Sequence, residues 1–546
     1  MRKLLVTPNV GRIGFALLVG ALASAVVTAA EEVPRRTLSN IGATPQTLTI
    51  LHTNDIHGHL ESWVGWDGEF AGEQVGGLDR LAALIRNVRT EVGGQRVLLL
   101  DAGDTIGDTM IAAETQGRAV IETMNALAYD AMVIGNHEPD FSAATLRARI
   151  AEARFPVLAA NIRGANNQLF AKPYVIREID DIRVGILGIA YPNTPLTSAK
   201  RNVEGLHFLG ATETAGKYVP IMRREGAKII IALTHLGLSA DKALAEAVSG
   251  IDLIVGGHSH NRMKDAIRVR DTLIVQAGAH GSDLGRLDLS IDSGRIISHR
   301  RTLTPITGED SDTAVAQIIA RTQAPYRERM DEHVGRATGV IIRAQTIAGQ
   351  EPEKRDAESP ADDLFADAIR ETTRSDIAFL PGLGYGIALQ PGKITAAQLR
   401  NLIPHDSAVW AMRLTGTQIR QVLEQAIENF MSTDVTRKVG GMIQVSGLRF
   451  SYDPEAPPYR RVKEITVGNR ALAPAGSFTV AVNALLAEGG HNYKWFERGG
   501  DRREVGKQYE MVRSWIERHG EVSAPPTDRI TKWRISEKTS PEQFKR

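Results

Sequence analysis

One short stretch decides how the rest of this sequence is interpreted: Leu48-Thr49-Ile50-Leu51-His52-Thr53-Asn54-Asp55-Ile56-His57-Gly58. Its first half is rich in apolar and β-branched residues, which predicts a buried strand over 48–53. Its second half is polar, and Asp55 and His57 offer a carboxylate and an imidazole on one tight loop. A buried strand that runs into such a loop is typical of α/β proteins, which place their ligands at the carboxyl ends of strands.

The same pattern recurs along the first 300 residues. Further strands are predicted at 97–100, 131–134, 184–187, 229–233, 253–255 and 273–275, with helices at 78–92 and 119–127. Alternating strands and helices indicate a layered α/β fold. Polar residues come just after several of these strands, namely Asp104, Asn136, His137, His235, His258 and His260. We therefore expect their side chains to converge at one edge of the fold.

The length of 546 residues is too great for a single core and favours two domains. Segment 46–305 is predicted to be the first domain, and segment 306–335, which is polar and then helical, a linker helix. Segment 336–535 is predicted to be a second α/β domain. Its expected elements are helices at 361–372 and 417–429 and strands near 447–452 and 477–482. The charged tail after Arg534 is expected to be disordered.

The first thirty residues have the composition of a cleavable secretory signal, predicted to span 1–30. Arg2 and Lys3 open the chain, an apolar run follows at 13–27, and small residues end at Ala30. The apolar run of about 15 residues is shorter than the roughly 20 needed to cross a bilayer. We expect a periplasmic or secreted protein with no stable membrane anchor after cleavage.

Charge and cysteine content narrow the possible functions. Lys and Arg total 65 against 64 Asp and Glu, and this near-neutral balance gives no basis for a nucleic-acid-binding surface. The absence of cysteine excludes disulfides, thiolate metal sites and a lipid anchor on cysteine. A metal ion would therefore be held by His, Asp, Glu, Asn or water. No feature of the sequence indicates a partner protein.

The polar motifs have the residue types of a dinuclear hydrolytic site, which needs a bridging carboxylate flanked by nitrogen and oxygen ligands. Asp104 can bridge, and Gly103 before it allows a close approach of the backbone. Together with Gly135-Asn136-His137-Glu138, Thr234-His235 and Gly257-His258-Ser259-His260, the set resembles the calcineurin-like metallophosphoesterases. More narrowly it resembles the secreted 5′-nucleotidase family. The resemblance is strong over about 46–300 and looser over 336–535.

This resemblance implies a fold and a set of site residues. The fold is a four-layer metallophosphoesterase β-sandwich flanked by helices, followed by a second α/β domain that selects the substrate. One divalent cation would be held by Asp55, His57, Asp104 and His260, and the other by Asp104, Asn136, His235 and His258. The family often has Gln at the position of His260. Manganese and zinc are the leading candidates, although mixed N/O ligands also suit cobalt and iron.

The resemblance also implies a catalytic dyad of His137 and Asp140, with Pro139 replacing the family's usual Phe between them. Two cations lower the pKa of a shared water and polarise the phosphoryl oxygens. His137 would stabilise developing charge or protonate the leaving oxygen. Asp140 would orient the imidazole through its other ring nitrogen.

The substrate-binding residues are predicted less directly, because the second domain departs from the family pattern. Arg355 matches the opening of that domain, whereas Met442 and Leu485 stand where the family has base-stacking Phe rings. The Asn and Arg expected in segment 381–386 are absent. Rings elsewhere, such as Trp410, could take over the stacking. The candidate substrate contacts are Arg355, Tyr385, Met442, Leu485, His491 and Tyr493.

The predicted function is hydrolysis of a small phosphate monoester, with 5′-nucleotides or related nucleotide derivatives as the leading substrates. Segments 380–386 and 423–441 also resemble the sulfur-oxidation thiosulfohydrolases, which share the dinuclear core. A periplasmic thiosulfohydrolase or another non-nucleotide ester hydrolase is therefore the alternative. A binding protein that only keeps the fold is a third hypothesis, and the intact ligand set argues against it.

Overall fold

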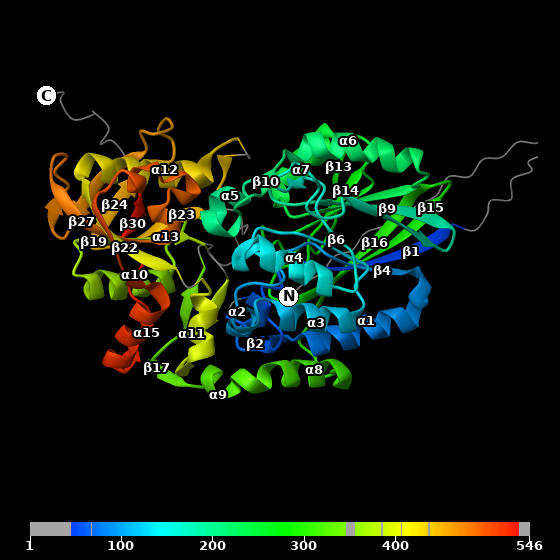
Figure 1. Ribbon diagram of the computed structural model, residues 1–546, viewed down its shortest axis with the longest axis horizontal. Helices are drawn as coiled ribbons and strands as arrows, with labels where there is room; N and C mark the ends of the chain where they lie inside the picture. Colours follow the sequence, from blue (N-terminus) through cyan, green and yellow to red (C-terminus); the bar gives the residue numbers. More distant parts are fainter. Residues whose placement is uncertain are drawn as a thin grey trace, which may run out of the picture. The chain divides into compact units, whose positions relative to one another are not determined.

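The computed structural model describes residues 45–66, 68–344, 355–383, 386–405, 407–434 and 437–533. The predicted signal peptide, the tail after Arg534 and Tyr385 lie outside these residues. Two six-stranded sheets dominate the first 305 residues (Figure 1). The first sheet has the order β16-β15-β1-β4-β5-β6. Its strands are β1 (Gln46–Thr53), β4 (Val97–Asp101), β5 (Ala131–Val133), β6 (Val157–Leu158), β15 (Asp283–Asp292) and β16 (Arg295–Pro305).

The second sheet has the order β13-β14-β12-β11-β9-β8. Its strands are β8 (Tyr174–Ile179), β9 (Ile182–Ile189), β11 (Ile229–Thr234), β12 (Leu253–Gly256), β13 (Ile267–Val269) and β14 (Thr272–Val275). Neighbouring strands run parallel over part of each sheet. In the first sheet these strands are β1, β4, β5 and β6, and in the second they are β9, β11, β12 and β14. Parallel strands present their carboxyl ends at one edge, so the loops that follow them gather there.

A shared apolar core joins the two sheets. Side chains of the first sheet, such as Ile50 and Leu98, are fully buried in one cluster with side chains of the second, such as Ile186 and Ile231. Helices cover the two outer faces, because alternate residues of a strand point to opposite sides. The first sheet is covered by α1 (Leu78–Val92) and α3 (Arg118–Leu127), and the second by α6 (Ala211–Arg224) and α7 (Leu238–Ala247). The four-layer α/β sandwich is thus confirmed.

A helical connector follows the first two sheets. It consists of α8 (Thr313–Gln323), a 3-10 turn and α9 (Arg327–Met330), and α8 packs on α1 and α3. Asp312 caps α8, since its side chain accepts hydrogen bonds from the backbone N–H groups of Ala314 and Val315. These elements lie within segment 306–335, although its last three residues belong to strand β17 (His333–Ala337).

The C-terminal part, residues 333–533, is built around a mixed five-stranded sheet of order β23-β19-β27-β22-β28. Its strands are β19 (Ile377–Gly382), β22 (Ala408–Thr415), β23 (Gly441–Ser446), β27 (Ser477–Asn483) and β28 (Gly500–Lys507). Helix α10 (Pro360–Thr373) packs beside Ala378 and Leu380, and α12 (Gly416–Met431) beside Ile377 and Phe379. Alternation along β19 therefore separates two apolar clusters, one on each face of the sheet.

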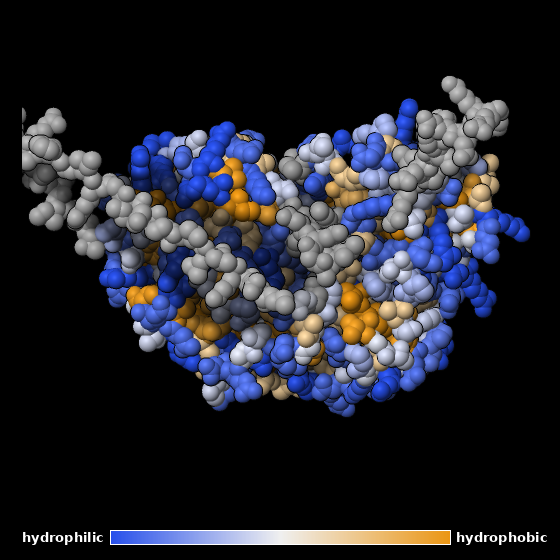
Figure 2. Space-filling view, turned by 180° about the vertical axis from the view of Figure 1, so that it is seen from behind, coloured by the Kyte–Doolittle hydropathy of each residue, from blue (hydrophilic) through white to orange (hydrophobic). Residues whose placement is uncertain are grey.

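The surface is mainly hydrophilic, and Figure 2 shows apolar residues in separate small patches on one face. The large apolar side chains that are most exposed, among the described residues, are scattered singly, as in Leu169, Ile297 and Val340. No helix within the described ranges is both long and apolar enough to cross a membrane.

Candidate metal centre

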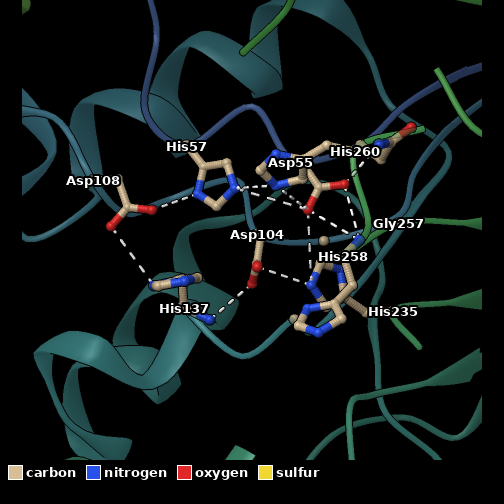
Figure 3. Close-up of polar contacts among 12 residues, drawn as sticks. Asp55, His57, Asp104, Asp108, His137, His235, Gly257, His258 and His260 are labelled. Carbon is tan, nitrogen blue, oxygen red and sulfur yellow. Dashed lines mark hydrogen bonds and ion pairs between the residues drawn. The ribbon is translucent and has the colours of Figure 1, made fainter. Parts of the chain in front are cut away.

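Six of the seven predicted ligands come together where the carboxyl ends of the two sheets meet (Figure 3), and the seventh, Asn136, lines the same cleft. Each lies on a loop just after a parallel strand, β1, β4, β5, β11 or β12. Five of them adopt a left-handed backbone: Asp55 (φ 54°), His57 (50°), Asp104 (55°), His258 (76°) and His260 (58°). Residues other than glycine seldom adopt this conformation, and such strain concentrates at functional sites. The loops are bent to aim these side chains inward.

The first group of ligand atoms surrounds the Asp55 carboxylate, which is fully buried. His260 Nε2 lies 3.4 Å and His57 Nε2 3.8 Å from Asp55 Oδ1, and the two ring nitrogens are 3.1 Å apart. The carboxylate is held from behind, because the backbone N–H of His258 donates to both its oxygens at 3.0 Å. Three ligand atoms thus converge within bonding range of one point.

The second group surrounds Asp104. His235 Nε2 lies 2.8 Å from Asp104 Oδ2, and the His258 ring packs edge-on against His235 with ring centroids 5.2 Å apart. Asn136 Oδ1 is buried without a hydrogen-bond partner in the described structure. A buried polar atom left in this way is costly unless something binds it. The residues therefore fit a cation, which an amide oxygen can bind.

Neighbouring groups fix which ring nitrogen each histidine presents. His57 Nδ1 lies 2.5 Å from Asp108 Oδ2, and His235 Nδ1 donates to the carbonyl oxygen of Ala102 at 2.7 Å. In both rings Nε2 is then left facing the other ligands. Metal-binding histidines are oriented in this way by a carboxylate or carbonyl on the other nitrogen.

Charges at the site also favour a cation. Burial works against protonation of His235, yet the Asp104 carboxylate outweighs it and raises the pKa of His235 to about 10. Burial also lowers the pKa of His258 and of His260, which keeps these imidazoles in the neutral form that binds metals. The carboxylates attract positive charge while two neutral nitrogens supply lone pairs.

His137 and Asp140 form a hydrogen-bonded pair beside these ligands. His137 Nδ1 lies 2.7 Å from Asp140 Oδ2, and the His137 backbone N–H donates to Asp104 Oδ1 at 2.8 Å. Burial opposes protonation of the ring, but the carboxylates of Asp108, Asp104 and Asp140 outweigh it and raise the pKa of His137 well above its usual value. This arrangement suits a proton donor that sits next to the metal ligands.

The structure brings in residues that the sequence analysis did not assign. Glu138 accepts hydrogen bonds from the backbone N–H groups of Asp104, Thr105 and Gly135, and so ties the loop after β4 to the loop after β5. Asp108 is buried between His57 and His137. In the sequence, only the repeat of Gly-Asp at 103–104 and 107–108 pointed to Asp108.

Two further histidines reach the site from distant segments. His280 is buried within 5.6 Å of His57 and His260, ring centroid to ring centroid. His405 comes from the C-terminal part and stacks on His137. Neither residue stands in a recognisable motif, so sequence spacing could not have placed them.

A cleft of about 340 Å³ opens over the metal ligands and is lined by both parts of the chain. Three of the predicted substrate contacts line it, Arg355, Leu485 and His491. Met442 and Tyr493 are instead fully buried in the apolar core around α12. Their positions on the sequence suggested a replacement for the missing rings, but packing of the C-terminal core takes both side chains away from the cleft.

Comparison with known proteins gives matches in both parts of the chain. A family profile for calcineurin-like phosphoesterase matches residues 48–262, and one for the 5′-nucleotidase C-terminal domain matches residues 333–498. The snake venom 5′-nucleotidase of Naja atra is 29% identical over 87% of this chain and 96% of its own. The trifunctional nucleotide phosphoesterase YfkN of Bacillus subtilis is 26% identical over 88% of this chain. This chain spans only 34% of YfkN.

Solved structures give the same result. The 5′-nucleotidase precursor of Thermus thermophilus superimposes with a TM-score of 0.79 at 26% identity, over 89% of this chain and 99% of its own. The sulfate thiohydrolase SoxB of the same genus also reaches 0.79, over 89% of this chain and 96% of its own. At 24% identity, SoxB shows the shared fold alone.

The fold, the ligand set and the two profiles define a metal-dependent phosphoesterase. The second profile covers the C-terminal part, so the chain pairs a calcineurin-like phosphoesterase domain with a 5′-nucleotidase C-terminal domain, as its similarity to 5′-nucleotidases also indicates.

Proposed function

We propose that this protein hydrolyses phosphate monoesters, with 5′-nucleotides or related nucleotide derivatives as substrates. The observation that carries the proposal is the convergence of four imidazoles, two carboxylates and one amide beside the His137–Asp140 pair. The similarity to 5′-nucleotidases along nearly the whole chain supports the substrate class.

Asp104 is central to this proposal. One of its oxygens faces His235, and it also lies close enough to His57 and His137 to share a group of possible metal ligands with them. We infer that two divalent cations would be held here, one by Asp55, His57, Asp104 and His260 and the other by Asp104, Asn136, His235 and His258, so that both would use Asp104. When bound, the cations supply a more acidic water and polarise the phosphoryl oxygens. Manganese and zinc are the proposed ions, and cobalt and iron also suit these mixed N/O ligands.

His137 is proposed to serve the leaving group. Its Nδ1 is engaged by Asp140, and Nε2 is the ring nitrogen that we propose meets an ester oxygen in the cleft. A proton passed from Nε2 to that oxygen would neutralise the departing alkoxide as the P–O bond breaks, giving the free alcohol. Asp140 would keep the ring in the tautomer and orientation that this transfer needs.

The cleft walls are proposed to choose the substrate. Three guanidinium groups line it, from Arg201, Arg355 and Arg400, and guanidinium matches the geometry of phosphate oxygens. Leu485 and His491 line it as well. We further propose that residues 1–30 direct export, so that the enzyme acts on esters outside the cytoplasm.

A substrate panel tests the proposal. Purified protein supplied with manganese or zinc would be compared on AMP, p-nitrophenyl phosphate, a 2′,3′-cyclic nucleotide, a UDP-sugar and a thiosulfonated peptide. Higher kcat/KM on AMP or another nucleotide than on p-nitrophenyl phosphate would support the nucleotide assignment. Equal values would reject base recognition but keep phosphoesterase activity. Turnover of the thiosulfonated peptide alone would favour the sulfur-ester alternative.

A further inference from the structure

His405, which the C-terminal part contributes, lies flat against the face of His137. The two imidazole planes are inclined by only 4°, with ring centroids 5.3 Å apart. Both rings line the cleft, and their side chains are 37% and 15% exposed, respectively. His137 is therefore bounded on one face by a second flat ring that comes from a segment more than 250 residues away.

The same two carboxylates flank both rings. Asp140 Oδ2 lies 2.7 Å from His137 Nδ1 and 3.5 Å from His405 Nδ1. Asp108 Oδ1 lies 3.6 Å from His137 Nδ1 and 3.6 Å from His405 Nε2. Only the shortest of these separations is a hydrogen-bond distance. Asp140 therefore interacts more strongly with His137 than with His405. His405 contacts His137 mainly through the surface of its ring.

The loop that carries His405 is docked beside Asp108. It lies between α11 (Ala396–Leu402) and β22. At the end of α11, Asn401 Oδ1 accepts a hydrogen bond of 3.1 Å from the backbone N–H of Met110, two residues beyond Asp108. After His405, the carbonyl oxygen of Ser407 accepts from the backbone N–H of Gln508. The ring is therefore delivered to His137 by a loop anchored at both ends.

We propose that His405 is a positioning residue for His137, an inference that rests on the proposed function. Asp140 holds the His137 ring at one edge nitrogen, and a contact at that atom resists tilting of the ring plane less than a contact across the ring face does. Side-chain torsions of this sp³–sp² type have broad energy wells, so the stacked ring of His405 would restrict that tilt. Because the two histidines come from different parts of the chain, the proton donor is fully ordered only where these parts meet.

Substitutions at His405 test this proposal. Misplacing a catalytic group by an ångström costs on the order of 100-fold in rate. We expect kcat of His405→Ala on p-nitrophenyl phosphate to fall by about tenfold or more, with KM changed by less than about threefold. His405→Phe keeps a flat ring and should retain most of kcat. The matched control is His519→Ala, because His519 also stacks on a ring, that of Trp515, but on the surface of α15 (Gln508–His519).

A second readout does not depend on turnover. In zinc-loaded protein, the Nδ1–H signal of His137 would be followed by histidine ¹⁵N–¹H NMR and assigned by its loss in His137→Ala. We expect this signal to broaden or disappear in His405→Ala and to persist in His405→Phe and His519→Ala. An unchanged signal and kcat in His405→Ala would overturn the proposal, as would failure of His405→Phe to restore them. If the parent protein cleaved no ester, the proposed function would be rejected. The NMR measurement would still test whether His405 orders the His137 ring.

Discussion

At the scale of single residues, the site depends on Asp104 more than on any other side chain. It lies within reach of His235 and takes a hydrogen bond from the His137 backbone. Replacing it by Asn removes a negative charge where two cations are expected to meet. We expect Asp104→Asn to lower kcat/KM on p-nitrophenyl phosphate by more than about 100-fold and to reduce bound metal, measured by elemental analysis. Asp310→Asn, at an exposed position, is the control.

A different result is expected for His137, because its proposed role is proton transfer rather than metal binding. His137→Ala should lower kcat by about 10²- to 10⁴-fold, the usual contribution of a general acid or base. The metal content of this variant should equal that of the parent. A variant that loses metal together with activity would show that His137 is a ligand.

At the scale of elements, the strand-to-loop turns are what shape the centre. Gly103 follows β4 with φ 86°, and a Cβ placed there would lie 2.8 Å from both the backbone nitrogen of Gly135 and the carbonyl oxygen of Val133. Gly93, at the end of α1, has the same φ of 86° but open space around it. Both Gly→Ala changes place alanine at a positive φ that L-residues seldom adopt, at a cost of about 1–3 kcal/mol.

We expect Gly103→Ala to be more destabilising than Gly93→Ala and to lose metal as well, because only the former must push two loops apart. Urea unfolding gives the free energy of each variant, and elemental analysis gives its metal content. Equal unfolding free energies in the two variants would contradict the crowding argument.

A pair of carboxyls at the start of α10, Glu358 just before the helix and Asp363 in its first turns, has an effect on stability that depends on pH. Burial raises the pKa of Asp363 and of Glu358, although Arg529 beside them opposes the shift. Stability from such groups is complete below the pKa of an unfolded carboxyl, about 4, and is lost as pH rises through the folded-state pKa. We expect Asp363→Asn to flatten the fall in Tm between pH 6 and 9, measured by differential scanning fluorimetry. Asp310→Asn should follow the parent curve.

Much of this fold could be predicted from local patterns. The apolar runs at 48–53, 97–100 and 229–233 each become a buried parallel strand, since such runs can be satisfied only inside a sheet. The seven predicted ligands meet because each follows a parallel strand of one of the two sheets. His405 and His280 could not be predicted, because their positions depend on how distant loops dock. Met442 and Tyr493 were predicted to contact substrate from their places in family motifs. Such places do not show which side chains the core will bury, and the core buries both.

At the scale of the whole molecule, the metal centre ties the two large sheets together. Asp55, Asp104 and Asn136 follow strands of the first sheet, and His235, His258 and His260 follow strands of the second. Ligands that bind only the folded state stabilise it in proportion to the logarithm of their concentration over Kd, about 2.7 kcal/mol at 100 times Kd.

Chelation should therefore loosen the entire sandwich. We expect EDTA to lower Tm by several degrees and to abolish hydrolysis, with both restored by adding manganese or zinc. Asp104→Asn, lacking the shared carboxylate, should show little further change in Tm with EDTA. An unchanged Tm for the parent after complete metal removal would show that the metal centre does not stabilise the two sheets.

The distribution of these ligands along the chain also has a consequence for biosynthesis. Asp55 and His260 face each other across the centre but are separated by more than 200 residues of sequence. A growing polypeptide cannot assemble the complete ion-binding cage until synthesis has passed His260. The compartment where the finished chain folds, rather than the one where its first strands are made, therefore determines which ions it acquires.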